Sequence, residues 1–347
     1  MTSPILTVES EPVIPNPYPP TIDVPYSRWY LFTRAAVLRS LASLAFAIHH
    51  LYPPSAPSPT LSTYVPSTLS HHKGPNLIRL DIYIPTTPPP ANGKRPGVIV
   101  FHGGGMVIGS GTDDARWARA CMDRLDAVII GVSYRLAPNY PFPIPVEDSA
   151  DAILHISTHA DEFGIDPDQL FLSGFSAGGN LVFTAFFLLC TPGVWGYPDI
   201  PTPRIKGMIA FYPVMDWSIP RETKRAANVR PEMTLPKNLT DLFDMSYLYP
   251  PPDPQDPRLN PGIASDELMN RLPPVHLCLC EYDMLLAEGL RLKERLEGLG
   301  KTVSCKVVEK EKHGWEKPPD FLKPSMGIEY NAALVEAQGW LERAASE

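Results

Sequence analysis

The feature that most constrains the fold is an alternation of short apolar runs with helical patterns between residues 77 and 345. The run LIRLDIYIP, at 77–85, alternates apolar and polar residues, which is typical of a half-exposed strand. Six later runs, from PGVIVF to VSCKVV, are mostly continuously apolar, as expected for strands buried on both faces of a parallel sheet. This order predicts βαβ units in a three-layer α/β fold. Helices are expected at 114–124, 147–160, 177–190, 285–298 and 328–345.

Prolines mark where this alternation stops. The chain has 42 prolines, concentrated at 12–25, 53–90 and 213–274. Because the last region lacks the strand–helix alternation, we expect it to leave the sheet and to form a cap together with a helix near the N-terminus. The predicted division is 1–75 for N-terminal cap helices and a proline-rich lead-in, then 76–345 for the α/β domain, with a cap insertion at about 213–271.

The expected N-terminal helix lies in RWYLFTRAAVLRSLASLAFAIHHLYPP, residues 28–54. Arg34 and Arg39 interrupt it and leave only 40–48 without charge, far short of the roughly 20 apolar residues that a membrane span needs. We interpret this segment as an amphipathic helix packed over a pocket, and peripheral membrane contact through residues 29–50 is the alternative. The apolar residues at helical spacing are Leu31, Ala35, Leu38, Ala42 and Phe46.

Charge and cysteine content narrow the range of partners. The formal net charge of −8 and the lack of a Lys/Arg-rich run exclude nucleic acid as an expected partner. The five cysteines are odd in number and lie in apolar segments, which suits free thiols in a reducing compartment. The predicted location is therefore cytoplasmic, with membrane association left open. Cys278 and Cys280 lack the other ligands of a zinc site, so we predict no metal ion and no cofactor.

Ser176 stands in LFLSGFSAGGNLVF, between two apolar runs and flanked by glycines at positions −2 and +2. A strand that ends at Gly174 and a helix that begins near Ala177 would place the serine on a sharp turn, with its hydroxyl lifted toward solvent. The positive end of the helix dipole would then lie beside any negative charge that develops there. This context predicts that Ser176 is a nucleophile.

A serine nucleophile needs a base and an acid that orients the base. Asp283 ends the run VHLCLCEYD, and His313 follows the run VSCKVVEK, so both would lie at the carboxyl edge of the sheet, where sites in such folds occur. Glu281 and Glu288 are the rival acids, the first on the other strand face and the second in the following helix. His313 is favoured over the remaining histidines, which fall on helices, at a strand start or ahead of the sheet.

The run VIVFHGGGMVIGS, at 98–110, follows the pattern of a buried strand and ends in His102 and three glycines. Glycines at 103–105 would let main-chain N–H groups point into the site beside Ser176. Together with the amide of Ala177, these groups would stabilise the oxyanion of a tetrahedral intermediate. The predicted oxyanion hole is therefore made by Gly103, Gly104, Gly105 and Ala177.

These motifs together resemble the hormone-sensitive-lipase-like family of α/β-hydrolases, carboxylesterase type. They stand in family order as HGGG at 102–105, YRLAPNYPFPIPVED at 134–148, GFSAGG at 174–179, DPRLNP at 256–261, EYDMLLAEG at 281–289 and HGW at 313–315. The resemblance implies an α/β-hydrolase fold with a mostly parallel eight-stranded sheet and a helical cap over the acyl pocket. It also implies the triad Ser176, Asp283 and His313, with Gly104, Gly105 and Ala177 as oxyanion donors. His102 and Asp148 match structural positions near the site.

The resemblance implies a serine ester hydrolase that acts on short-acyl or acetyl esters of small molecules, including secondary metabolites. Two alternatives stay open: a non-catalytic homologue that binds a small ligand, and an amide or formamide hydrolase. The first is disfavoured because all three triad residues are present. The second is disfavoured because those relatives carry a bulky aromatic where Gly105 stands. Trp217, Phe243 and Tyr247 are the candidates for the substrate pocket, with Tyr249 as a further aromatic.

Overall fold

A computed structural model describes residues 26–49, 56–70, 72, 76–318 and 325–345. The proline-rich stretch 12–25 and part of the predicted lead-in therefore lie outside the described residues. The described chain contains an eight-stranded sheet in the order β1-β2-β4-β3-β5-β6-β7-β8. β2 is antiparallel to both β1 and β4, and the other neighbouring strands are parallel. The strands are β1 Leu61–Pro66, β2 Leu77–Tyr83, β3 Arg95–Phe101, β4 Val128–Ser133, β5 Ile165–Phe175, β6 Ile205–Phe211, β7 Val275–Tyr282 and β8 Val303–Lys312.

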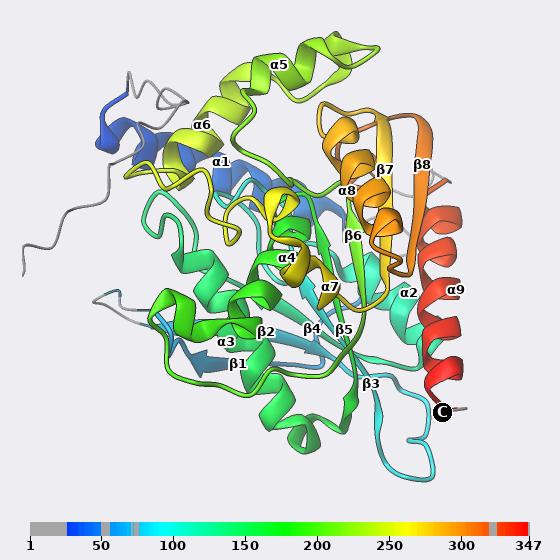
Figure 1. Ribbon diagram of the computed structural model, residues 1–347. Helices are drawn as coiled ribbons and strands as arrows, with labels where there is room; N and C mark the ends of the chain where they lie inside the picture. Colours follow the sequence, from blue (N-terminus) through cyan, green and yellow to red (C-terminus); the bar gives the residue numbers. More distant parts are fainter. Residues whose placement is uncertain (1–25, 50–55, 71, 73–75, 319–324, 346–347) are drawn as a thin grey trace, which may run out of the picture.

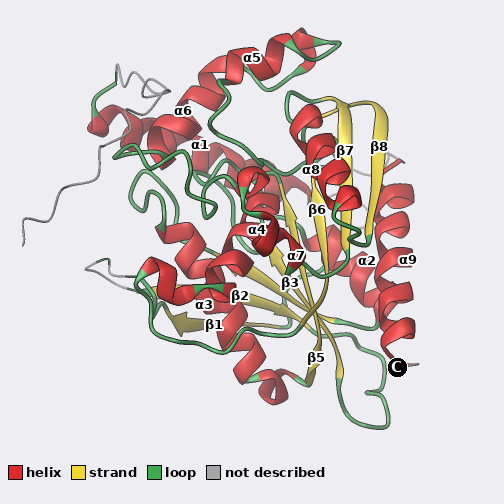
Figure 2. Ribbon diagram, viewed as in Figure 1, coloured by secondary structure: helices red, strands yellow, loops and turns green. Residues whose placement is uncertain are grey.

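Helices cover both faces of this sheet, as Figures 1 and 2 show. On one face α4 (Ala177–Cys190) packs on β3, β5 and β6, α3 (Ile144–Thr158) packs beside it, and α8 (Leu286–Gly298) covers β7 and β8. On the other face α2 (Ala115–Leu125) and α9 (Ser325–Ala345) pack together. Two separate apolar cores result, one on each side of the sheet.

A group of helices lies beyond the carboxyl ends of the central strands. It consists of α1 (Arg28–His49), α5 (Arg221–Ala226) and α6 (Lys237–Tyr247), and Figure 1 shows α1 alongside α6. Leu31 of α1 is buried against Leu242 and Met245 of α6. The short α7 (Asp266–Asn270) leads back into β7. None of the helices in the described ranges is long and apolar enough to cross a membrane.

The predicted fold class is confirmed, and so is the strand–helix alternation from β3 onward. The structure adds β1, which pairs with β2 as an edge strand although it lies in the stretch 1–75 that we placed ahead of the α/β domain. Its pattern gave no signal because Leu61 and Tyr64 are exposed and only Val65 is buried. Pro66 is tolerated there because an edge strand need not donate a ladder hydrogen bond outward.

Candidate active site

Ser176 occupies the turn between β5 and α4, where its backbone is held at φ +54° and ψ −114°. This left-handed region is unfavourable for a residue with a side chain, and the packing around the turn maintains it. The turn is possible because its flanking glycines leave no side chain in the way. A Cβ on Gly174 would overlap the carbonyl oxygen of Gly178, and a Cβ on Gly178 would overlap that of Phe101. The two glycines therefore let β5, α4 and β3 meet closely behind the serine.

The structure brings the three predicted triad residues together in one hydrogen-bonded chain. His313 Nε2 lies 2.7 Å from Ser176 Oγ, and His313 Nδ1 lies 2.6 Å from Asp283 Oδ2. The second carboxylate oxygen of Asp283 accepts a hydrogen bond from the Leu285 amide at 3.1 Å. Asp283 is only 1% exposed, and the ring of Tyr212 packs against the imidazole with the centroids 4.6 Å apart. The carboxylate thus fixes the orientation of the imidazole toward the serine.

The rival residues have other contacts. Glu281 accepts a hydrogen bond from the Lys310 amide, and Glu288 pairs with Lys224 and accepts from the Met215 amide. Burial raises the pKa of Glu288. His276 lies on β7, where its Nδ1 contacts Ser304 Oγ at 2.9 Å, and burial lowers its pKa to about 4. These residues support the fold and do not take part in the hydrogen-bonded chain.

The glycines of the HGGG motif lie beside Ser176. We call residues 102–109 the glycine loop. A Cβ added to Gly103 would lie 3.5 Å from Ser176 Cβ, and Gly104 and Gly105 have φ values of +112° and +61°. Gly103, Gly104 and Gly105 all line the same cavity as Ser176 and His313. Ala177 is buried at the first position of α4, where its backbone N–H has no acceptor within the helix.

The cavity over Ser176 has a volume of about 270 Å³ and is lined by the glycine loop, by residues around the hydrogen-bonded chain and by side chains of the stretch 214–247. The predicted aromatics Trp217, Phe243 and Tyr247 all line it, whereas Tyr249 does not and is 40% exposed. Phe243 lies directly over Gly105, because a Cβ on that glycine would overlap its ring. This contact explains why the position opposite Phe243 has no side chain. The sequence did not point to several further lining residues: Leu235, Leu239, Thr240 and Leu285.

Charged residues in the cavity wall were also missed from sequence. Arg221 donates two hydrogen bonds of 2.9 Å to Asp244, which also accepts from Trp217 Nε1. Lys317, four residues after His313, pairs with Asp114 and Glu316. Burial raises the pKa of Asp114 to about 6, although the neighbouring Lys317 opposes the shift. The Arg221–Asp244 and Lys317–Asp114 pairs join residues far apart in the chain, so no local pattern reveals them.

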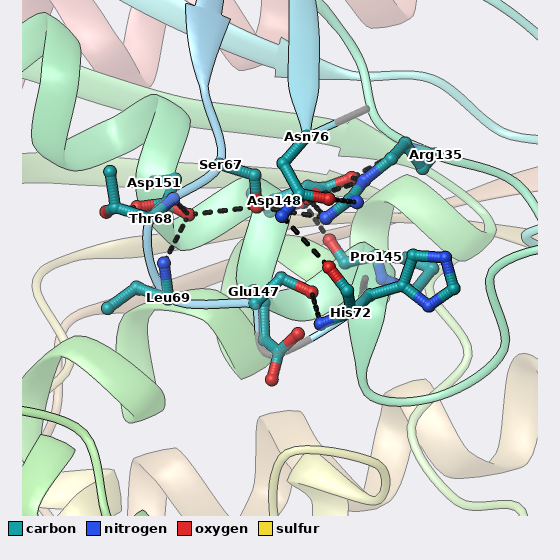
Figure 3. Close-up of polar contacts among 12 residues, drawn as sticks. Ser67, Thr68, Leu69, His72, Asn76, Arg135, Pro145, Glu147, Asp148 and Asp151 are labelled. Carbon is teal, nitrogen blue, oxygen red and sulfur yellow. Dashed lines mark hydrogen bonds and ion pairs between the residues drawn. The ribbon is translucent and has the colours of Figure 1, made fainter. Parts of the chain in front are cut away.

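Asp148, a motif residue, belongs to the buried polar cluster around Arg135 that Figure 3 shows. Its carboxylate accepts hydrogen bonds from the Arg135 guanidinium, the shortest at 2.6 Å, and from the Arg135 amide at 2.9 Å. Arg135 also reaches Ser67 and Asn76, so it joins the segments around β1 and β2 to the loop after β4. His102 is buried with a lowered pKa, and its carbonyl accepts from Tyr134 Oη at 2.7 Å. The cluster therefore fixes the segment that carries Tyr134.

The described residues contain no group of three or more His, Cys, Asp or Glu side chains that could hold a metal ion. The chemistry that this arrangement can perform is that of its own side chains and amides. A hydroxyl is hydrogen-bonded to an imidazole, the imidazole is oriented by a buried carboxylate, and three consecutive glycines line the same cavity as the hydroxyl. Such a constellation performs acyl transfer through a covalent intermediate.

Comparison with known proteins agrees with this geometry. Residues 98–317 match the family model described as alpha/beta hydrolase fold, so the chain belongs to the α/β-hydrolase family. The resemblance to its hormone-sensitive-lipase-like members, seen in the sequence, is confirmed.

Two relatives and one solved structure illustrate the likeness. Carboxylic ester hydrolase LipN of Mycobacterium tuberculosis is 32% identical over 230 residues, which are 65% of this chain and 59% of LipN. Arylacetamide deacetylase-like 3 of Homo sapiens is 28% identical, with 70% of this chain and 72% of that protein covered. The ester-hydrolase EH1AB1 from the metagenome of Lake Arreo superposes with a TM-score of 0.74 at 26% identity, with 89% and 91% of the chains covered. The names of these proteins agree with the predicted hydrolase class.

Proposed function

We propose that this protein is a serine hydrolase that cleaves carboxylic esters of small molecules through an acyl-enzyme intermediate. The observation that carries the proposal is the hydrogen-bonded chain Asp283–His313–Ser176, which opens into an apolar cavity next to the glycine loop. A non-catalytic ligand-binding role would not require these three side chains to be aligned within hydrogen-bonding distance of one another.

In the proposed mechanism, His313 Nε2 takes the proton of Ser176 Oγ as the oxygen attacks the ester carbonyl. Asp283 holds the imidazole in place and stabilises the imidazolium that forms. The amides of Gly103, Gly104, Gly105 and Ala177 stabilise the oxyanion of the tetrahedral intermediate. His313 then gives its proton to the leaving alcohol, which leaves the acyl group on Ser176. Water, activated by the same histidine, releases the acid and restores the serine.

We propose that short acyl groups, acetyl among them, are the preferred substrates. Phe243 lies directly over Gly105 and limits the room beside the glycine loop, and the cavity of about 270 Å³ ends against cap side chains. Because another relative, 29% identical over 296 residues, is named arylacetamide deacetylase, acetylated aryl amides are substrates to be compared with esters.

Hydrolysis of p-nitrophenyl esters from acetyl to palmitoyl, beside a matched N-acetyl arylamine, tests this proposal. We expect the highest kcat/KM at acyl chains of about two to six carbons, with about 0.8 kcal/mol gained for each buried methylene until the cavity is filled. We also expect the ester to be preferred over the amide and no increase in rate when substrate exceeds its solubility. Activation on an emulsified long-chain triglyceride would contradict the short-acyl assignment.

We further propose that α1 and residues at about 213–271 form a cap over a catalytic domain that comprises residues 76–345 together with β1. The inner face of α1 packs on α6, which supplies Leu239, Phe243 and Tyr247 to the cavity wall. Deletion of residues 1–50 should therefore lower stability and broaden or abolish acyl selectivity. A truncated protein with unchanged activity and selectivity would contradict the role of α1 as a lid.

The outer face of α1 supports a second, peripheral role at a membrane surface. Trp29, Val37, Leu41 and Leu44 are more than half exposed there, and the described helix contains no acidic residue. We propose that this face provides the peripheral membrane contact that the sequence left as the alternative for residues 29–50. Val37→Glu with Leu41→Glu should abolish sedimentation with anionic phosphatidylserine vesicles and leave hydrolysis of a soluble ester unchanged. A wild-type protein that does not sediment with them would contradict the contact.

A cytoplasmic location remains part of the proposal, supported by five cysteines that are all free.

A further inference from the structure

The backbone of the glycine loop needs support from outside the loop. Gly104, Gly105 and Met106 have positive φ values one after another, and Met106 is a non-glycine residue at φ +61°. Within the loop, the Val107 and Ile108 amides both donate to the Gly104 carbonyl. A run of left-handed residues persists only where its surroundings fix it. The position of the glycine amides therefore depends on what holds residues 102–109.

One support comes from the segment 134–137. Tyr134 Oη donates to the His102 carbonyl at 2.7 Å, and the Ala137 amide donates to the Met106 carbonyl at 2.8 Å. This segment is itself fixed by the Arg135–Asp148 cluster shown in Figure 3. The base of the glycine loop is thus tied to the main domain.

A second support comes from the cap. Arg39 of α1 donates from Nε to the Val107 carbonyl at 2.8 Å and from Nη2 to the Ala137 carbonyl at 2.7 Å. One guanidinium therefore bridges the glycine loop and the segment that supports it. Arg39 is part-buried where it contacts the two carbonyls. This partial removal from water lowers the pKa of its guanidinium. Arg28, three turns earlier on the same helix, donates to the next carbonyl along, that of Pro138, at 2.7 Å.

We propose that Arg39 is a positioning residue for the oxyanion hole, through which the cap helix α1 fixes the glycine amides of the main domain. This inference rests on the proposed ester-hydrolase function. Val107 lies two residues after Gly105, so a shift of its carbonyl moves the neighbouring amides relative to Ser176. The planar fork of arginine suits this bridge because two of its N–H groups reach separate acceptors at once, which a lysine ammonium on a flexible stem does poorly.

The test compares Arg39→Ala, Arg39→Lys and the matched control Arg34→Ala on a soluble short-acyl ester. Arg34 lies on the exposed side of the same helix, where it donates a hydrogen bond to Tyr30 Oη at 2.6 Å. Titration of active sites with a fluorophosphonate normalises each rate to folded enzyme. The inhibition constant of a trifluoromethyl ketone, which forms an oxyanion on Ser176, reports the oxyanion hole directly.

Arg39→Ala should lower kcat by about 10- to 100-fold with KM changed less than about threefold, because the lost interaction acts only on the transition state. The inhibition constant of the trifluoromethyl ketone should rise by the same factor by which kcat/KM falls. Arg39→Lys should recover part of the loss, and Arg34→Ala should match the wild type. If Arg39→Ala is too unstable to assay, the same comparison is made with Arg39→Lys: its loss in inhibitor affinity should equal its loss in kcat/KM.

A lid that merely loosens gives a different pattern. Leu31→Ala removes buried packing between α1 and α6 but leaves the Arg39 bridge, so it should lower the melting temperature without the matched loss in kcat and inhibitor affinity. The proposal is overturned if Arg39→Ala and Arg39→Lys keep kcat per titrated site within about threefold, or if only KM rises. A wild-type protein without ester hydrolysis would instead refute the proposed function.

Discussion

Replacing Phe243 with alanine should move the acyl preference of the enzyme toward longer chains. Phe243 projects from α6 into the cavity, is 8% exposed and covers Gly105. Its removal extends the existing cavity beside Gly105. Because the new space joins a cavity that is already present, the loss in folding stability should be smaller than the about 3–5 kcal/mol typical of Phe→Ala in a closed core.

The size of the expected gain in kcat/KM for longer acyl chains follows from the number of methylene groups that the variant can bury. Each additional methylene that enters apolar space contributes about 0.8 kcal/mol, which is about fourfold in kcat/KM. If the space left by the ring accepts about two more methylenes, kcat/KM for the longer ester should exceed the wild-type value by about 15-fold. The acetyl ester should lose activity in the variant, because its methyl group no longer has an aromatic wall to contact.

The assay is the p-nitrophenyl ester series with wild type, Phe243→Ala and the control Tyr249→Ala. Tyr249 is an aromatic of the same region that does not line the cavity, so its variant should keep the wild-type profile. An unchanged optimum in Phe243→Ala, or a shift toward shorter chains, would refute the assignment of this cavity as the acyl site.

Three further changes test other parts of the account. Ser176→Ala, His313→Ala and Asp283→Ala should each reduce turnover by several orders of magnitude, and the Ser176→Ala/His313→Ala double variant should be little worse than Ser176→Ala, whereas additive losses would show separate roles. The folded pKa of His276, about 4, lies below its ordinary value of about 6.5, so stability should be lost as pH falls from 6.5 toward 4. The free energy of unfolding, measured with urea at pH 7 and pH 4.5, should fall between these values by about 2–3 kcal/mol less in His276→Gln than in the wild type. An equal fall in both proteins would contradict the effect of burial on His276. Gly178→Ala should abolish soluble folded protein because its Cβ overlaps the Phe101 carbonyl, whereas Gly298→Ala, where nothing lies within 4 Å, should be neutral or stabilising in thermal melts.

The sequence was informative wherever a local pattern determines geometry. The apolar run before Gly174 and the helical pattern after Ala177 define the turn at Ser176, and the strand ends at Asp283 and His313 place both on one edge of the sheet. β1 was missed because its exposed residues and proline hide the strand period. Arg39, Lys317 and Asp244 were missed for another reason: each acts through a partner distant in sequence, and no local pattern shows which segments the fold brings together.

Covalent labelling of Ser176 tests the central claim most directly. Incubation with a fluorophosphonate followed by mass spectrometry of the intact protein and its peptides should show one adduct per chain, on Ser176. Ser176→Ala, with its fold checked by circular dichroism, should show neither the adduct nor ester turnover. A label on another residue, or a Ser176→Ala protein that still reacts and still hydrolyses the ester, would contradict the account.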